Sequence, residues 1–373
     1  ITYVIPGSPA AQAGLERGDW IMKVDTSYIS KKYETYLLQG TKAVKLTLGE
    51  WKEVEIEDEE DGNEGGDGED EGPMMEYRVV PIDDPVEMPA AQIVEDNPVH
   101  KYEIIESPVK KIRVGYLMYN SFTAGTKAEP EKYNNELRSV SQKFKEAGVQ
   151  AVILDLRYNE GGSMDCVQLL GTILTSADRL GEPMAYLEYN DKNTDKDATI
   201  LFGTDREINL NLHSLIAITS GTTMGAPEML IRSLFLEDTY PIATVGSSTK
   251  GQNVATEQFI NEEFLWSVNP VVCTVYNSQH DTYGAISPAT DLKVSETTIA
   301  GSTNYSEFLP FGTFDKDGKS ERLLKIAIGV LDGTYPPKDD ETPEESTTQT
   351  RFKVEKSVSS PASRRFSSKG LRL

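Results

Sequence analysis

The chain has 373 residues, of which 38% are hydrophobic and 26% charged, and its formal net charge is −23 at pH 7. This length is enough for two or three domains, and the composition is that of a soluble globular protein. The negative charge argues against nucleic acid or an anionic membrane as a partner, because phosphate would repel it. No run approaches the roughly 18 apolar residues of a membrane span, and no signal-peptide pattern is found.

The first third of the chain predicts short strands and turns. The elements expected there are a strand at 1–5, a short helix at 10–13 closed by Gly14, and strands at 44–48, 76–80 and 102–105. Between Glu57 and Glu71 lie ten acidic residues and no basic one. Residues 57–72 have no apolar side chain to bury, so we expect a disordered, solvated loop there rather than a calcium site.

From residue 111 onward, strands and helices alternate. The expected strands are 112–119, 150–157, 215–219 and 242–246, and the expected helices are 130–147, 164–176 and one that begins after Gly225 with Pro227 in its first turn. The strand at 150–157 is almost wholly apolar, as in a parallel sheet covered on both faces. This alternation predicts an α/β core.

The last segment and the isolated thiol and imidazole groups give no sign of a cofactor or metal site. Residues 336–373 are rich in Pro, Ser, Thr and charge, which predicts a solvated tail, although 350–354 could add an edge strand. Cys166 and Cys273 are far apart in apolar surroundings, so we expect buried free thiols, with one disulfide as the alternative. The three histidines are scattered, without partners at motif spacing. We therefore expect no cofactor and no metal.

Residues 7–21 read Gly-Ser-Pro-Ala-Ala-Gln-Ala-Gly-Leu-Glu-Arg-Gly-Asp-Trp-Ile. This stretch resembles the Gly-Ser-Pro-Ala…Ala-Gly-Leu…Gly-Asp-x-Ile motif of the PDZ domains in bacterial proteases. PDZ domains bind peptide C-termini by adding a strand to a sheet edge. The strand and carboxylate-binding loop that normally precede the motif are missing from this chain. The resemblance therefore implies a truncated PDZ-like, β-rich domain over residues 1–105, with a purely packing role as the alternative.

The second half contains a series of motifs in a fixed order. Residues 155–162 read Asp-Leu-Arg-Tyr-Asn-Glu-Gly-Gly, residues 219–228 read Thr-Ser-Gly-Thr-Thr-Met-Gly-Ala-Pro-Glu, and residues 246–254 read Gly-Ser-Ser-Thr-Lys-Gly-Gln-Asn-Val. A first core strand at 114–122 precedes them, and a Gly-Ile-x-Pro-Asp-like region at 283–291 follows. This series is similar to that of the carboxyl-terminal processing peptidases, also called tail-specific proteases. The resemblance implies a multidomain α/β protein whose residues 106–335 form a peptidase core of the ClpP/crotonase type.

In that family a serine attacks the peptide carbonyl, a neutral lysine takes its proton, and backbone N–H groups stabilise the oxyanion. The resemblance places the nucleophile position at Gly225, three residues before Glu228, and the general-base position at Gln252, directly after Gly251. Glycine has no nucleophilic side chain, and a primary amide is too weak a base near neutral pH. The sequence therefore predicts that the Ser–Lys dyad is lost, and either loss alone removes most activity.

The same resemblance assigns the oxyanion hole to Gly161 or Gly162, with a plain strand-to-helix turn as the alternative. Asp155 and Arg157 are expected to form an ion pair that braces the turn.

Two substitutes for the lost dyad stay open. Lys250 lies two residues before the base position, and an alignment without a two-residue insertion around 237–241 would select it as a displaced base. Ser220, Thr222 or Thr223 could replace the nucleophile, although turn hydrogen bonds are their ordinary role.

The leading hypothesis is an inactive peptidase homologue that binds polypeptide segments or C-termini in the protease groove, and whose partners include an active relative. The alternatives are an active serine endopeptidase that uses Lys250, and a structural envelope protein with a vestigial groove. The resemblance also implies a bacterial cell-envelope location, periplasmic or lipid-anchored.

Overall fold

The computed structural model describes residues 1–30, 37–55, 75–263, 266–294, 296, 308–316, 318–336 and 370–373. They belong to two compact units, one built on Ile1–Asp96 and the other running from Asn97 to the last residues of the chain. The loop expected at 57–72 and the edge strand considered at 350–354 lie outside the described residues. No helix of the described part is long and apolar enough to span a bilayer.

The first unit is a small antiparallel sheet with one short helix. Its elements are α1 (Pro9–Gln12), β1 (Trp20–Val24), β2 (Ser27–Tyr28), β3 (Val44–Glu55), β4 (Met75–Pro81) and β5 (Val86–Met88). The strand order is β2-β1-β3-β4, and β5 also pairs with β3. Ser8 caps α1, because its Oγ accepts the Ala11 N–H at 3.2 Å. The strand expected at 1–5 is wrong, since these residues pair with no described strand.

The second unit contains a five-stranded sheet with order β13-β12-β8-β7-β6. Its strands and helices are β6 (Val99–Glu106), β7 (Arg113–Tyr119), α3 (Lys132–Glu146), β8 (Ala151–Asp155), β12 (Leu215–Thr219), α5 (Ala226–Leu234), β13 (Ile242–Gly246) and α6 (Arg322–Asp332), with α4 (Met164–Leu174) between β8 and β12. β7, β8, β12 and β13 run parallel, and β6 pairs antiparallel with β7. The predicted α/β core is confirmed. The unit boundary precedes the one suggested at residue 105, because β6 pairs with the core strand β7.

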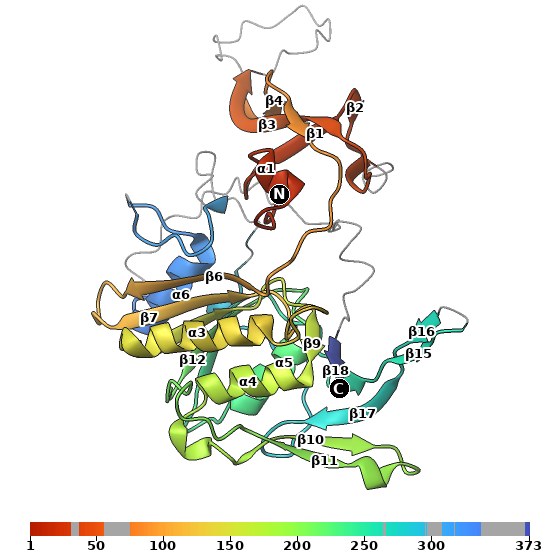
Figure 1. Cartoon of the computed structure of the whole chain (residues 1–373). Helices are drawn as coiled ribbons and strands as arrows, with labels where there is room; N and C mark the ends of the chain where they lie inside the picture. Colours follow the sequence, from red (N-terminus) through yellow and green to blue (C-terminus); the bar gives the residue numbers. More distant parts are fainter. Residues whose placement is uncertain are drawn as a thin grey trace, which may run out of the picture. The chain divides into compact units, whose positions relative to one another are not determined.

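Helices cover both faces of this sheet. Figure 1 shows α3, α4 and α5 on one side of the parallel strands and α6 on the other. The arrangement follows from right-handed crossovers, which bring successive connecting helices to the same face. All five residues of β8 and all five of β12 are buried, as their apolar sequences require.

A second sheet stands beside the first and has the order β11-β10-β17-β14-β18-β9. Its strands are β9 (Gly161–Ser163), β10 (Pro183–Tyr189), β11 (Ala198–Leu201), β14 (Val254–Thr256), β17 (Val271–Tyr276) and β18 (Gly370–Arg372), and a small hairpin of β15 (Phe259–Asn261) and β16 (Trp266–Val268) follows β14. β18 comes from the end of the chain and pairs parallel with both β9 and β14; Figure 1 draws it in dark blue next to β9. The expectation of a solvated tail is therefore wrong for its last residues.

Candidate functional site

The site predicted from the motifs lies where β8 and β12 end. β8 leads into the turn that carries Asn159, Gly161 and Gly162, and β12 leads into the turn that ends at Gly225 before α5. The carboxyl ends of adjacent parallel strands meet at one sheet edge, where α/β proteins commonly bind ligands. β8 and β12 are such neighbours, with Ile218 opposite Asp155.

Asn159 holds the two turns together. Its Nδ2 donates to the carbonyl oxygen of Tyr119 at 2.8 Å, and its Oδ1 accepts the Gly161 N–H at 3.0 Å. Its own carbonyl oxygen accepts the N–H of Met224, the residue before Gly225, at 3.2 Å. This fully buried side chain therefore positions the turn expected to supply an oxyanion hole.

Gly225 is the N-cap residue of α5 and has φ 71° and ψ −101°. Residues with a side chain rarely adopt such a φ. A Cβ at this position would lie 2.5 Å from the Gly370 carbonyl carbon and from the Leu371 nitrogen. The predicted nucleophile position is thus occupied by backbone from the end of the chain.

Glu228 links the nucleophile turn to the loop expected to carry the general base. It is fully buried, and its carboxylate accepts N–H groups from Gly225 at 2.8 Å, Gly251 at 2.5 Å and Gln252 at 2.9 Å. The hydroxyl of Thr249 donates to it as well. These hydrogen bonds to a charged acceptor fix the two segments relative to each other. In the sequence, Glu228 served only as a landmark for counting, yet an acidic residue in the first turn of a helix is a signal for such a cap.

Gln252 and Lys250 point to different environments. The side chain of Gln252 packs against the chain end, since a Cβ on Gly370 would lie 2.4 Å from its Oε1. That oxygen is buried and has no hydrogen-bond partner among the described residues. Lys250 is exposed, and its backbone N–H donates to the Thr223 carbonyl oxygen at 3.1 Å. A lysine becomes a neutral base when its ammonium group is desolvated, and exposure does not supply this.

The hydroxyls considered as substitute nucleophiles hold the turn after β12. Thr223 Oγ1 donates to the Leu156 carbonyl oxygen at 2.9 Å, and Thr222 Oγ1 donates to the Arg157 carbonyl oxygen at 2.7 Å. Ser220 Oγ also donates to the Arg157 carbonyl oxygen. All three make the turn contacts that serine and threonine ordinarily make.

A buried ionic network centres on Arg157, in the turn after β8. Arg157 is fully buried and bonds Asp155 at 2.7 Å and Glu321, at the start of α6, at 2.8 Å. Tyr116 donates its hydroxyl to Asp155 at 2.8 Å. Burial by itself lowers the pKa of Arg157, but the neighbouring carboxylates of Asp155 and Glu321 outweigh it, so the pKa lies well above its usual value. The expected ion pair of Asp155 and Arg157 is present and extends to Glu321 and, at 3.5 Å, to Glu296.

Both cysteines are buried and free. Among the described residues, no cluster of three His, Cys, Asp or Glu side chains could hold a metal ion.

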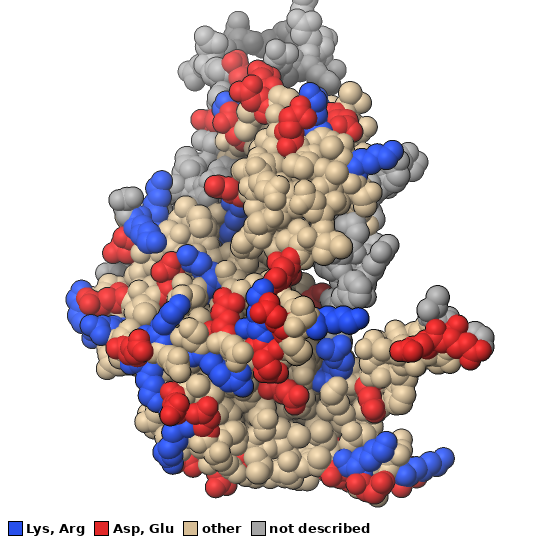
Figure 2. Space-filling model, viewed as in Figure 1, with Lys and Arg blue, Asp and Glu red and all other residues tan. Residues whose placement is uncertain are grey.

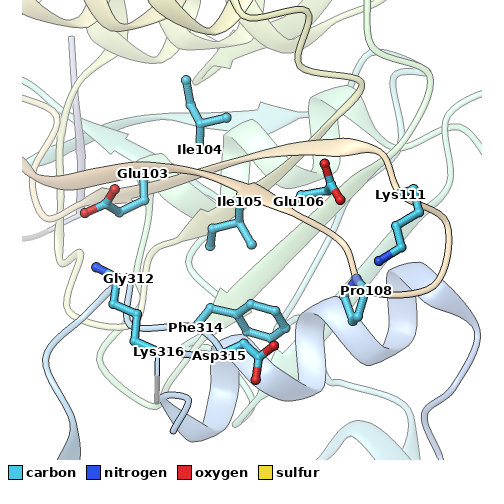
Figure 3. Close-up of a pocket in the computed structure, with 10 residues that line it drawn as sticks. All are labelled: Glu103, Ile104, Ile105, Glu106, Pro108, Lys111, Gly312, Phe314, Asp315 and Lys316. Atoms are coloured by element: carbon cyan, nitrogen blue, oxygen red, sulfur yellow. The ribbon is translucent and has the colours of Figure 1, made fainter. Parts of the chain in front are cut away.

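A surface pocket of about 370 Å³ lies elsewhere in the second unit, between β6 and residues 312–316 (Figure 3). Phe314 and Asp315 lie below the strand, and Lys111 comes from the loop after β6. None of the predicted site residues lines this pocket. Figure 2 shows positive and negative side chains intermixed over the visible face of the helices α3 and α4, without a patch of a single sign.

Comparison with known proteins identifies the family to which this fold belongs. The profile of peptidase family S41 matches residues 113–269, which include Gly161, Gly162, Gly225, Lys250 and Gln252, and a PDZ domain profile matches residues 1–47. The crystal structure of an S41 protease from Bacteroides fragilis NCTC 9343 is 36% identical over 89% of this chain and 77% of that one, with a TM-score of 0.71. The chain belongs to peptidase family S41, with a PDZ domain at its N-terminal end.

Two more distant structures are similar in part. The photosystem II D1 C-terminal processing protease is 17% identical over 81% of this chain and 69% of that one, with a TM-score of 0.43. A lipoprotein from Streptococcus agalactiae is 19% identical over 50% of this chain and 63% of that one, with a TM-score of 0.38. Both similarities are too weak to add to the assignment. No curated protein matches the chain.

Proposed function

We propose that this S41 protein does not cleave peptides and instead binds polypeptide segments or C-termini in the groove between β9 and β14. The observation that carries the proposal is the set of groups around Gly370. Gly161, Gly225 and Gln252, three positions that would belong to the chemistry of a peptidase, all pack against this one stretch of peptide backbone.

Neither the nucleophile nor the general base of peptide cleavage is found at its predicted position. Gly225 offers no oxygen or sulfur to attack a carbonyl, and the buried amide of Gln252 accepts no proton of a nucleophile near neutral pH. Lys250 is exposed, and the nearby hydroxyls of Ser220, Thr222 and Thr223 are engaged with backbone carbonyls. These contacts favour binding over catalysis.

The groove itself does not need reactive side chains. β9 and β14 each present backbone hydrogen-bonding groups to a strand between them, and β18 pairs with both. Adding a strand is a general way to bind an extended peptide, with affinity from the main chain and specificity from alternate side chains. A groove built in this way survives the loss of a catalytic dyad.

Restoring the dyad tests the proposal. The wild-type protein should neither cleave casein nor react with a fluorophosphonate probe. Gly225→Ser combined with Gln252→Lys should gain labelling at residue 225 in a chain that ends at Lys369, where the backbone that would clash with the new side chain is removed, whereas either single change should not. Cleavage by the wild-type protein that Lys250→Ala abolishes would overturn the proposal in favour of an active peptidase.

Binding is tested separately with fluorescent unstructured peptides that have free carboxylates. Saturable binding, measured by anisotropy, is expected for the chain that ends at Lys369. If neither this chain nor the full chain binds any peptide, the groove is vestigial and the protein is structural.

We also propose a location in the bacterial cell envelope, periplasmic or lipid-anchored, with an active relative among the partners. Membership of a family with a solved member from Bacteroides supports the first part. Fractionation of the native host, followed by immunodetection, checks the location, and recovery in the cytoplasmic fraction would overturn it.

A further inference from the structure

The last four residues of the chain occupy the proposed groove as an extended strand. The Gly370 N–H donates to the Glu160 carbonyl oxygen at 2.7 Å on one side. On the other side, the Leu373 N–H donates to the Thr256 carbonyl oxygen at 3.0 Å, and Thr256 Oγ1 donates to the Leu371 carbonyl oxygen at 3.1 Å. Backbone contacts thus hold the segment on both edges.

The register of this strand brings Gly370 to the predicted oxyanion hole. Gly370 lies opposite Gly161 in a parallel ladder, and a ladder with this bonding directs its carbonyl toward the Gly162 N–H. A Cβ on Gly161 would lie 1.8 Å from the Gly370 carbonyl oxygen. The tail therefore lies where the backbone of a bound peptide would meet the site.

The backbone conformation at Gly370 strongly favours glycine. Its φ is 91°, which disfavours any residue with a side chain. A Cβ would in addition meet both Oε1 and Nε2 of Gln252, at 2.4 and 2.9 Å. The next residue, Leu371, is 1% exposed and belongs to the main hydrophobic core cluster, whereas Leu373 is exposed. The groove thus distinguishes a glycine followed by a buried aliphatic residue.

We propose that the groove recognises an extended peptide segment with glycine at the position of Gly370 and an aliphatic residue after it, and that the chain's own residues 370–373 occupy it until such a ligand displaces them. This inference rests on the proposed peptide-binding function and names its ligand class and its regulation. The groove of the resting protein is closed by a ligand carried on the same chain.

The strength with which residues 370–373 compete with an external peptide follows from their attachment to the same chain. Residue 370 is joined to the described residue Pro336 by 33 residues of the same chain. A ligand attached in this way competes at an effective concentration that can approach about 1 mM. If the tail segment has an intrinsic Kd of about 100 µM, an external peptide would then bind the full chain about tenfold more weakly than a chain without the tail.

The experiment compares three proteins with one peptide. The peptide is fluorescein-labelled Lys-Gly-Leu-Arg-Leu with a free carboxylate, and the proteins are the full chain, the chain that ends at Lys369, and the full chain with Gly370→Ala. The shortened chain and G370A should bind the peptide about tenfold more tightly than the wild-type chain. Leu373→Ala, which changes an exposed side chain, should bind like the wild-type chain.

Two controls locate the binding. The peptide Lys-Ala-Leu-Arg-Leu should bind the shortened chain about tenfold more weakly, because alanine would have to adopt the positive φ of Gly370 and displace the Gln252 side chain. Gly225→Ala in the shortened chain should weaken binding of the glycine peptide similarly, whereas binding to the PDZ domain would be unaffected by it.

The outcomes separate this inference from the function on which it rests. If the full and shortened chains bind a panel of peptides equally, peptide binding stands and competition by the tail is overturned. If the shortened chain is unfolded and full-length G370A binds no peptide, β18 is a permanent strand of the fold and the inference is again overturned. If no protein binds any peptide, the proposed function itself fails.

Discussion

The network around Arg157 and the groove around Gly370 lie at the ends of the same strands but are built in opposite ways. Charged side chains make the contacts of the network, where one guanidinium meets the carboxylates of Asp155, Glu321 and Glu296. Backbone makes most contacts of the groove, where glycines let peptide units approach closely. The support of this site therefore depends on charged side chains, whereas most contacts at the proposed binding surface come from the backbone. The proposed loss of reactive side chains is compatible with the proposed groove for this reason.

Replacing Arg157, the centre of the network, is expected to have the largest effect on stability. Arg157→Ala should lower the free energy of unfolding of the second unit by about 3–5 kcal/mol, because the buried carboxylates of Asp155 and Glu321 lose the guanidinium that bonds both of them. Urea unfolding followed by circular dichroism measures the change. Arg138→Ala, at an exposed arginine 3.6 Å from Glu131, should cost less than about 0.5 kcal/mol. Equal effects of the two changes would show that the network contributes little.

At Glu228, charged side-chain contacts and backbone contacts meet, because its carboxylate accepts hydrogen bonds from three backbone N–H groups of the site. Glu228→Ala should cost about 2–4 kcal/mol, because these buried donors lose a charged acceptor. It should also abolish peptide binding by the chain that ends at Lys369. The matched control is Glu237→Ala at an exposed glutamate. Unchanged peptide affinity in the Glu228 variant would mean that the groove does not depend on this clamp.

A smaller effect is expected at the turn before β9. Asn159→Ala should cost about 1–3 kcal/mol, because the Gly161 N–H and the Tyr119 carbonyl each lose a buried partner. Asn135→Ala, at an exposed position of α3, should stay within about 0.5 kcal/mol of the wild type. The same urea titration distinguishes them, and a cost at Asn159 no larger than at Asn135 would contradict the positioning role.

The two thiols give the mildest test, because they report only whether the packing opens. Burial raises the pKa of Cys166 to about 12 and that of Cys273 to about 11, so both remain protonated thiols at pH 8. Mass spectrometry should find neither thiol alkylated by iodoacetamide in the folded protein, and both alkylated in urea. Rapid reaction of Cys166 without denaturant would indicate that the start of α4 opens.

Much of the core follows from the sequence for simple physical reasons. The run at 242–246 coincides with β13, and Gly225 precedes α5 as its spacing from Glu228 suggested. Apolar periodicity and helix caps act locally, so they can be recognised in a single sequence. The ion pair of Asp155 and Arg157 was expected, but its extension to Glu321 depends on where α6 packs.

The rest of the site depends on contacts that the local sequence does not encode. Residues 370–373 lie in a polar, proline-rich segment whose composition predicts no structure, and their pairing uses backbone groups that every residue has. Residues 370–372 form a strand only because β9 and β14 offer edges with which they pair. The strand expected at 1–5 failed because apolar side chains require burial but not strand pairing, and Ile1 and Val4 pack against the small core of the first unit without joining its sheet.

The long sequence separation between β18 and its partner strands also has a consequence for biosynthesis. β9 and β14 are translated long before Gly370, and domains fold in order as the chain emerges from the ribosome. The edges of these two strands that face β18 therefore stay unpaired until Gly370–Arg372 has emerged. The interval before that is a period in which a neighbouring polypeptide can enter the groove without having to compete with the tail.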